Sequence, residues 1–208
     1  MRLAIIGAGN VGATLARTLA RAGHAVVFAA RDPSSASVRA ALAAVGGEAR
    51  ALPIAEAVAG AEVALLCTPW DAAQQALAAA GDFGGRVLVD CTNPLGPDLS
   101  LVLGHTTSGG EQVAAWARGA RVVKAFNTTG YDNMANPRYP AGAATMFICG
   151  DDAEAKQMTA RLAEDAGFEV VDCGPLQQAR LLEPLAALWI SLAVGGLGRD
   201  FAFRLIRR

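Results

Sequence analysis

Short apolar runs alternate with amphipathic segments along the first 127 residues of the chain. The apolar runs have the length typical of buried strands, and they lie at 2–6, 25–29, 48–52, 62–67, 86–91 and 121–126. Between the first two runs, Val11, Leu15 and Leu19 recur at the spacing of one helix face. This alternation predicts an α/β fold whose doubly wound, mostly parallel sheet is covered by helices on both faces.

A second, shorter set of elements follows residue 142. The pattern predicts, in order, a strand at 144–149, a helix capped by Asp151 or Asp152 and ending near Ala166, a strand at 169–173 and a helix from about Gln178. Pro184 is expected to kink or restart that last helix. Because no low-complexity linker separates the two sets, we expect a core at 1–141 and a short α/β extension at 142–208, packed together as one compact unit.

Charge and cysteine usage narrow the class of protein. The chain has 18 basic and 19 acidic residues, so it lacks the long-range field that attracts nucleic acid or an anionic membrane. The late apolar run 184–198 has a length below that expected of a bilayer span, so we expect a cytoplasmic protein. The cysteines form no C-x-x-C pair, and each ends an apolar run, which favours buried thiols over a metal site or disulfides; they are Cys67, Cys91, Cys149 and Cys173.

A glycine-rich loop joins the first strand to the first helix, and it comprises Gly7, Ala8, Gly9, Asn10, Val11 and Gly12. In this context Gly7 permits a tight turn, Gly9 lets the backbone approach a pyrophosphate, and Gly12 allows close contact between helix and strand. The helix N-terminus adds unpaired N–H groups and a positive dipole end. The loop therefore predicts a Rossmann-type dinucleotide-binding core.

The end of the second strand bears on which dinucleotide binds. An acidic residue usually stands there and accepts hydrogen bonds from the adenosine ribose, but this chain has Ala30 followed by Arg31. A guanidinium pairs well with a 2′-phosphate, and Ser34 and Ser35 are further candidate donors. We therefore expect NADP(H), with Asp32 as the residue that would instead serve an NAD ribose.

Three polar, proline-containing or threonine-rich turns follow later strands. Ligands bind at the carboxyl ends of parallel strands, so these turns are candidates for the nicotinamide and substrate sides of the site. We assign Cys67, Thr68, Pro69, Trp70 and Asn93 to the cofactor, and Asn93, Pro94, Asn127, Thr128 and Thr129 to the substrate pocket. The last two turns open the long irregular stretches 92–109 and 127–142, whose length is typical of functional loops.

Acid–base chemistry has little support in the sequence. His24 enters the second strand, at the edge away from the expected ligand, and His105 is read as a surface residue of a long loop. Lys124 lies inside a predicted strand and is interpreted as structural. We therefore assign no catalytic side chain and no metal site.

Eight segments of the chain form a recognisable set: IIGAGNVGATLARTLARAGH, ARDP, CTPW, DCTNP, SGGEQVAAW, VVKAFNT, FICGDD and DCGPLQQARLLEPLAALWI. Together they resemble one family of redox enzymes, the NADPH-dependent oxidoreductases of the deazaflavin coenzyme F420. The N-terminal part is also similar to the NADPH domain of the STEAP ferric reductases.

The resemblance implies a Rossmann core, a short C-terminal extension, a homodimer, and direct hydride exchange between NADP(H) and a flavin-like ring. It implies that the glycine loop holds pyrophosphate, Arg31 the 2′-phosphate, and the turn at Thr68 the nicotinamide ribose. This chain departs from the family's usual residues at Ala8, Ala30 and Asn127, where Thr, Ser and His respectively are found in relatives.

The C-terminal helix is apolar on more faces than one sheet contact covers. A second copy of the chain would cover it, so we expect a homodimer that uses Leu188, Trp189 and Leu192; the alternative is a core helix buried within one chain.

Two other functions stay open beside deazaflavin or flavin reduction. One is an NADP-dependent dehydrogenase or reductase of a small carbonyl or imine, and the other is a non-catalytic NADP(H) sensor.

Overall fold

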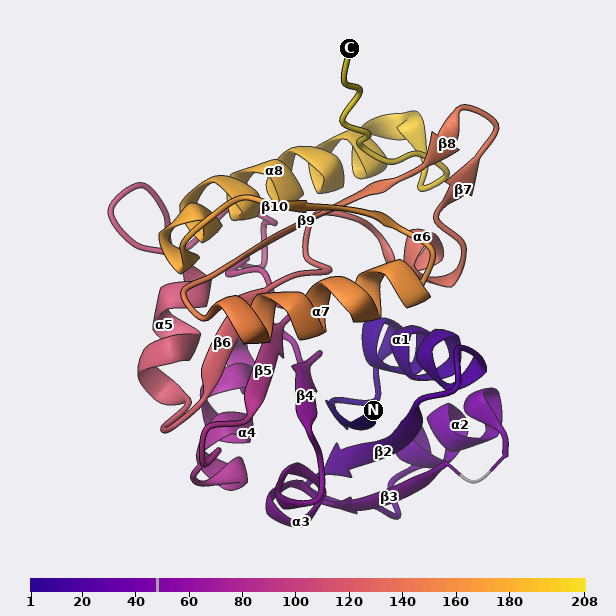
Figure 1. Ribbon diagram of the computed structural model, residues 1–208, viewed down its shortest axis with the longest axis vertical. Coiled ribbons are helices and arrows are strands. Elements are labelled where there is room, and N and C mark those ends of the chain that lie inside the picture. Colours follow the sequence, from indigo (N-terminus) through magenta and orange to yellow (C-terminus); the bar gives the residue numbers. More distant parts are fainter. Residues whose placement is uncertain (48) are drawn as a thin grey trace.

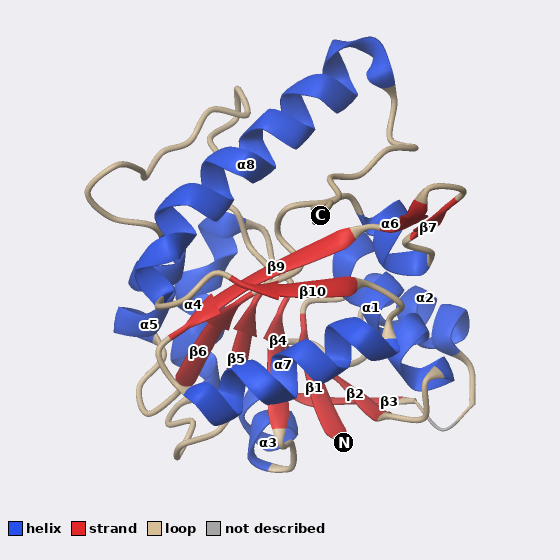
Figure 2. Ribbon diagram, turned by 45° about the horizontal axis from the view of Figure 1, so that its top comes forward, coloured by secondary structure: helices blue, strands red, loops and turns tan. Residues whose placement is uncertain are grey.

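An eight-stranded sheet forms the centre of the computed structural model, which describes residues 1–47 and 49–208 (Figures 1 and 2). The strand order is β10-β9-β6-β5-β4-β1-β2-β3. The strands are β1 Arg2–Ile6, β2 Ala25–Ala30, β3 Arg50–Pro53, β4 Val63–Leu66, β5 Val87–Asp90, β6 Arg121–Lys124, β9 Thr145–Gly150 and β10 Glu169–Asp172. Neighbouring strands pair in parallel except β6 and β9. The predicted α/β fold with a mostly parallel sheet is confirmed.

Helices cover both faces of this sheet. They are α1 Asn10–Arg21, α2 Ala36–Val45, α3 Ile54–Ala59, α4 Trp70–Ala80, α5 Gly109–Trp116, α6 Tyr131–Ala135, α7 Ala153–Asp165 and α8 Ala179–Leu192. Leu15 of α1 and Leu162 of α7 belong to the hydrophobic core on one face. Leu77 of α4 and Val113 of α5 belong to the core on the other. Successive side chains of β1 lie alternately in the two cores, since a strand directs successive residues to opposite faces.

The chain changes direction across the sheet between β1 and β4. From β1 it runs outward through β2 and β3, then returns to place β4 on the other side of β1, with Leu3 paired to both Val26 and Val63. Helices that follow β1 and β4 lie on opposite faces, which leaves a crevice at the carboxyl ends of these two strands. Such a switch point is where ligands bind in open α/β sheets.

Several strands are shorter than the sequence pattern predicts. The predicted strand at 48–52 is observed as Arg50–Pro53, and Glu48 lies outside the described residues. The strand predicted at 121–126 ends at Lys124, because Phe126 has a φ of 61° that a strand does not accommodate. The predicted loop 127–142 also contains α6 and one strand of a small hairpin, formed by β7 Arg138–Tyr139 and β8 Gly142–Ala143.

The last helix differs from the sequence expectation at Pro184. Helix α8 continues through Pro184 without a break, so the predicted restart at that residue is wrong. Just before the proline, the backbone carbonyl of Leu182 accepts from the Asn127 side chain and the carboxylate of Glu183 accepts from the Gly109 amide. A 3-10 turn at Leu176–Gln178 precedes α8 and a π-helical turn at Ala193–Leu197 follows it.

Together these turns and α8 form a helical stretch longer than the sequence suggested. It comprises 22 residues, Leu176–Leu197, and an 18-residue segment within it has a mean hydropathy of 1.4, which by length and composition is enough to cross a bilayer. The expectation that this region is too short was therefore wrong. Apolar core helices of soluble proteins pass the same criterion, so the finding by itself does not place the chain in a membrane.

The final residues fold back against α8 and the sheet. Trp189 stacks on Phe201 with ring centroids 4.9 Å apart, and its indole nitrogen donates to the Phe201 carbonyl. Farther on, the amide of Thr145 donates to the carbonyl of Phe203. Trp189 is only 3% exposed, so its predicted place on a dimer surface is wrong. Leu188 and Leu192 are exposed, as that prediction requires.

Candidate functional site

The glycine loop leaves the carboxyl end of β1 and leads directly into α1. Gly7 has a φ of 109°, and a Cβ there would lie 2.9 Å from the carbonyl oxygen of Cys67. A Cβ on Gly12 would lie 2.0 Å from the carbonyl oxygen of Gly7. Gly9 differs, since it precedes the first turn of α1 and a Cβ there meets nothing within 4 Å. Two of the glycines are therefore required by packing, whereas Gly9 keeps the outer side of the loop open.

A cavity of about 600 Å³ opens beside this loop at the carboxyl edge of the sheet. It is lined by the glycine loop, the end of β2, the turn after β4 and one face of α4. The lining includes seven positions predicted for the cofactor: Gly7, Ala8, Ala30, Arg31, Ser35, Thr68 and Pro69. Its volume is that of a small-molecule site. The structure thus brings together segments that are far apart in the sequence.

The charged residues after β2 have separate partners. The Arg31 guanidinium donates to Oε1 of Gln75, 3.0 Å away on α4. Oδ1 of Asp32 accepts from the amide and the hydroxyl of Ser34, and these bonds hold the pKa of Asp32 below its usual value. Ser34 is therefore bonded within its own turn. The carboxylate of Asp32 is already an acceptor in that turn, which leaves Arg31 as the cation at the cavity wall.

Trp70 contributes to a different part of the molecule than its neighbours Thr68 and Pro69 do. It starts α4 and packs on Trp116 of α5, with ring centroids 5.2 Å apart. Cys67, just before this turn, is buried and donates its backbone amide to the Ile6 carbonyl. Asn10 and Val11 form the first turn of α1, where N–H groups without intrahelical partners accumulate.

Two asparagines join the turns that follow β5 and β6. The Asn93 side chain donates to the Asn127 carbonyl at 2.9 Å, and Nδ2 of Asn127 donates to Oδ1 of Asn93 at 3.1 Å. Nδ2 of Asn127 also donates to the carbonyl of Leu182 on α8. The predicted substrate-pocket residues Asn93 and Asn127 thus form one unit, and α8 of the C-terminal extension lies against it.

Two buried polar atoms near this edge have no hydrogen-bond partner within the described part of the chain. They are Oδ1 of Asn127 and the hydroxyl of Thr68. An unpaired buried acceptor costs about 1–3 kcal/mol, so such atoms are typical of sites that a ligand completes. These two atoms, the open backbone at Gly9 and the Arg31 guanidinium together fit a dinucleotide, which carries polar groups at both its adenosine end and its nicotinamide end.

The neighbouring residues of the same turns pack more tightly. Thr128 is buried, and the hydroxyl of Thr129 accepts from Nδ2 of Asn133 at 2.7 Å. Pro94 lies against Gly109, where a Cβ would approach its ring to 3.1 Å. Phe126 holds its unfavourable φ while its amide contacts the Met146 sulfur at 3.0 Å. Backbone strain of this kind is often found at functional sites.

A buried ion triad that the sequence analysis missed lies under these turns. Nζ of Lys124 is 2.8 Å from Oδ2 of Asp90 and 2.8 Å from Oε1 of Glu183, and it also donates to the Thr92 carbonyl. Burial lowers the pKa of Lys124, but the two carboxylates outweigh it and the net pKa is raised. Because Asp90 also accepts from Thr92, the triad fixes the turn that carries Asn93.

Glu183 links this triad to the start of α5. Its carboxylate accepts the amides of Gly109 and Gly110, which are free donors at a helix N-terminus. The three ionic residues come from the segments DCTNP, VVKAFNT and LLEP, so segments that carried the family resemblance meet in one interior contact. Lys124 lies inside β6 and is fully buried, and the spacing of the three charges along the chain gave no signal that they meet.

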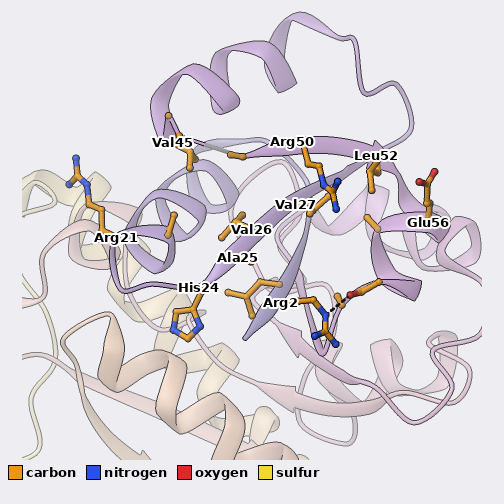
Figure 3. Close-up of a pocket in the computed structure, with 18 residues that line it drawn as sticks. Arg2, Arg21, His24, Ala25, Val26, Val27, Val45, Arg50, Leu52 and Glu56 are labelled. Carbon is orange, nitrogen blue, oxygen red and sulfur yellow. Dashed lines mark hydrogen bonds between the residues drawn. The ribbon is translucent and has the colours of Figure 1, made fainter.

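A larger cavity, of about 740 Å³, lies at the opposite edge of the sheet (Figure 3). Arg2, His24 and Arg50 line it. Helices α1 and α2 end beside it, and carbonyl ends of helices disfavour phosphate. His24 pairs with Asp165 there, 3.0 Å away, while His105 is exposed in its loop. This cavity is separate from the glycine loop, so we place the dinucleotide in the smaller one.

The fold and the glycine loop are those of a dinucleotide-binding protein. A family model described as NADP oxidoreductase, coenzyme F420-dependent, matches residues 2–94. The F420-dependent NADP reductase of Methanothermobacter marburgensis is 30% identical over 99% of this chain and 98% of that protein. The chain belongs to the F420-dependent NADP oxidoreductase family and is an NADP-dependent oxidoreductase.

Two further comparisons agree with this assignment. A crystal structure of a putative F420-dependent NADP reductase from Arthrobacter sp. FB24 has a TM-score of 0.90 and 33% identity, covering 99% of each chain. Rat metalloreductase STEAP3 is 32% identical over 99% of this chain, but the match spans 42% of that longer protein. The likeness therefore includes the C-terminal extension as well as the Rossmann core.

Proposed function

We propose that this oxidoreductase transfers hydride directly between NADP(H) and a deazaflavin, with coenzyme F420 as the first candidate acceptor. The observation that carries the proposal is the near end-to-end likeness to an F420-dependent NADP reductase, which extends through α8. Helix α8 accepts a hydrogen bond from Asn127 and so forms part of the wall beside the predicted substrate pocket. A related flavin is the next candidate.

The chain's own residues have distinct roles in this proposal. The glycine loop and the N-terminus of α1 hold the pyrophosphate, Arg31 and Ser35 hold the 2′-phosphate, and the turn at Thr68 holds the nicotinamide ribose. When bound, NADP(H) supplies or accepts the hydride. Oδ1 of Asn127 is the acceptor for an N–H group of one of the two rings.

Such a reaction needs positioning more than acid–base catalysis. Both carriers exchange two electrons as hydride, so alignment of the reacting carbons in a dry pocket provides most of the rate enhancement. The Asn93–Asn127 unit, in which Asn127 is buried and Asn93 is half-buried, is held by the ion triad and by α8, and it provides a rigid wall for that alignment. We therefore keep the assignment of no proton-transferring side chain.

We also propose that the enzyme is a homodimer built on the outer face of the last helical stretch. Leu181, Leu188 and Leu192 are 66%, 51% and 39% exposed, and their spacing of seven and four residues places them on one face of α8. Exposed leucines repeated along one helix face favour a second apolar surface, and two copies of the same face form a closed pair.

A panel of acceptors tests the proposed function. Purified enzyme is mixed under anaerobic conditions with NADPH and, separately, F420, FMN, a ferric chelate, a small carbonyl and a cyclic imine. We expect the highest kcat/KM with F420. A preference for the imine or carbonyl would replace the proposal by the dehydrogenase alternative, and tight NADPH binding without turnover would favour a sensor.

A further inference from the structure

We infer that Gln75 is a positioning residue that holds the Arg31 guanidinium for the 2′-phosphate of NADP(H), and thereby contributes to the choice of NADPH over NADH. The inference rests on the proposed role of Arg31. It assigns a function to a residue of α4 that lies far from the glycine loop and from ARDP in the sequence.

The two side chains meet at the wall of the 600 Å³ cavity. Arg31 directly follows β2, Gln75 projects from α4, and NH1 of Arg31 donates to Oε1 of Gln75 at 3.0 Å. Ala72, Gln75 and Ala76 line the cavity together because residues three and four apart share one helix face. The alanines contribute only methyl groups, so Gln75 is the long polar side chain that α4 presents to this cavity.

A neutral acceptor is suited to this role. Guanidinium has five N–H donors, and one bond to Gln75 leaves a paired set for bidentate contact with a phosphate. Because the amide oxygen carries no net charge, it orients Arg31 without neutralising it. Asp32, the nearby carboxylate that would neutralise Arg31, is instead bonded to Ser34.

Pre-orientation explains how an exposed contact affects affinity. Arg31 and Gln75 are both exposed, and a free arginine side chain loses rotamer entropy when it binds a phosphate. Because the bond to Gln75 restricts the guanidinium before the ligand arrives, less entropy is lost on binding. The effect is confined to ligands that carry a 2′-phosphate.

The binding of two nucleotide fragments tests the role of Gln75 without any measurement of enzyme activity. Dissociation constants for 2′,5′-ADP and 5′-ADP are measured by calorimetry for the wild type, Gln75→Ala and Gln75→Glu. Gln74, exposed on the same helix and outside the cavity lining, provides the matched controls Gln74→Ala and Gln74→Glu. We expect Gln75→Ala to weaken 2′,5′-ADP about three- to ten-fold, the worth of one hydrogen bond. Gln75→Glu should weaken it further, and 5′-ADP should bind the Gln75→Ala protein as it binds the wild type.

A double-mutant cycle with Arg31→Ala tests whether Gln75 acts through the arginine. We expect Gln75→Ala to cause no further loss of 2′,5′-ADP affinity once Arg31 is removed. An equal loss in both backgrounds, or Gln75 variants that match their Gln74 controls, overturns the inference while leaving the NADP assignment of Arg31 intact. A wild type that binds both fragments equally overturns that assignment as well.

Discussion

Lys124 and Glu183 form an ion pair of 2.8 Å in which neither side chain is more than 1% exposed. The pair joins β6 to α8, and Asp90 of β5 completes it on the other side. It explains how a C-terminal helix comes to lie against the asparagine turns, because a buried cation fixes the position of its counter-charges. The position of the Asn93–Asn127 unit therefore depends on this contact.

Replacing Lys124 with Met is expected to destabilise the protein strongly. The substitution leaves Asp90 and Glu183 buried without their cation, and breaking a buried pair in this way costs about 3–5 kcal/mol. Urea unfolding of the wild type and the variant measures the change. Lys156→Met is the matched control, because Lys156 pairs with the half-exposed Asp172 and surface pairs contribute at most about 1 kcal/mol. Equal losses for the two variants would contradict the account of the triad.

Alkaline pH is expected to destabilise the fold through its buried thiols. Burial raises the pKa of Cys149 to about 12, whereas an unfolded thiol ionises near pH 8.5. The folded state therefore keeps a proton that the unfolded state releases. Stability from this group is complete below about pH 8.5 and is lost as the pH rises toward 12, by about 1.4 kcal/mol per pH unit. Urea unfolding of Cys149→Ala between pH 8 and 10.5 should show a shallower decline; an identical slope would count against the prediction.

Two glycine substitutions are expected to separate folding from cofactor binding. A Cβ at Gly9 meets open space, so Gly9→Ala should fold with nearly normal stability and yet bind NADPH at least about tenfold more weakly, because the methyl group faces the ligand. A Cβ at Gly12 collides with the Gly7 carbonyl, so Gly12→Ala should lose stability as well. Thermal unfolding and NADPH titration measure both effects. Normal NADPH affinity in Gly9→Ala would place the pyrophosphate elsewhere.

Asn127→Ala is expected to slow hydride transfer while sparing the adenosine end of the site. Removal of the side chain deletes the unpaired Oδ1 and two hydrogen bonds to Asn93 and Leu182. We expect kcat with F420 to fall at least about tenfold, since loosened alignment of the rings affects the reactive geometry. The dissociation constant of 2′,5′-ADP should stay unchanged. An unaltered kcat would contradict the proposed role of Asn127 in aligning the two rings.

Leu188→Asp is expected to convert the proposed dimer into a monomer. The leucine is 51% exposed, so a charge there does not disturb the interior of one chain but opposes an apolar interface. Sedimentation velocity of the wild type and the variant distinguishes the two states. A wild type that is monomeric at micromolar concentration, or that associates with lipid vesicles instead of itself, would contradict the proposal.

The order of strands and helices was predictable because each element has its own periodicity. Leu15 and Leu19 repeat at helical spacing, and the apolar runs of β1 and β4 have the length of buried strands. Strand ends were less accurate, since Phe126 is apolar like the residues of β6 but has a backbone conformation that ends the strand. Periodicity reports which face a residue belongs to, and it carries no information on such local strain.

Contacts between distant segments were beyond the reach of the pattern. Trp189 looked like an interface residue because it is large and apolar, yet the returning tail covers it with Phe201. Nothing in the sequence pattern indicates that Glu183 of the last helix meets Lys124, because the two residues lie 59 positions apart and only the folded chain brings them to 2.8 Å. The contact between Arg31 and Gln75 likewise joins two segments that the pattern does not relate. The glycine loop was predictable because Gly7 and Gly12 have a fixed spacing within one strand–helix turn, where a Cβ on Gly12 would meet the Gly7 carbonyl.

Isotope transfer tests the central claim of direct hydride exchange most directly. NADPH labelled with deuterium at the reactive carbon of nicotinamide is mixed anaerobically with F420 and the enzyme in ordinary water, and the reduced deazaflavin is analysed by mass spectrometry. The account predicts that the deuterium moves to the deazaflavin without exchange with solvent. A reduced deazaflavin that carries only solvent hydrogen, or NADPH that is not consumed, would contradict it.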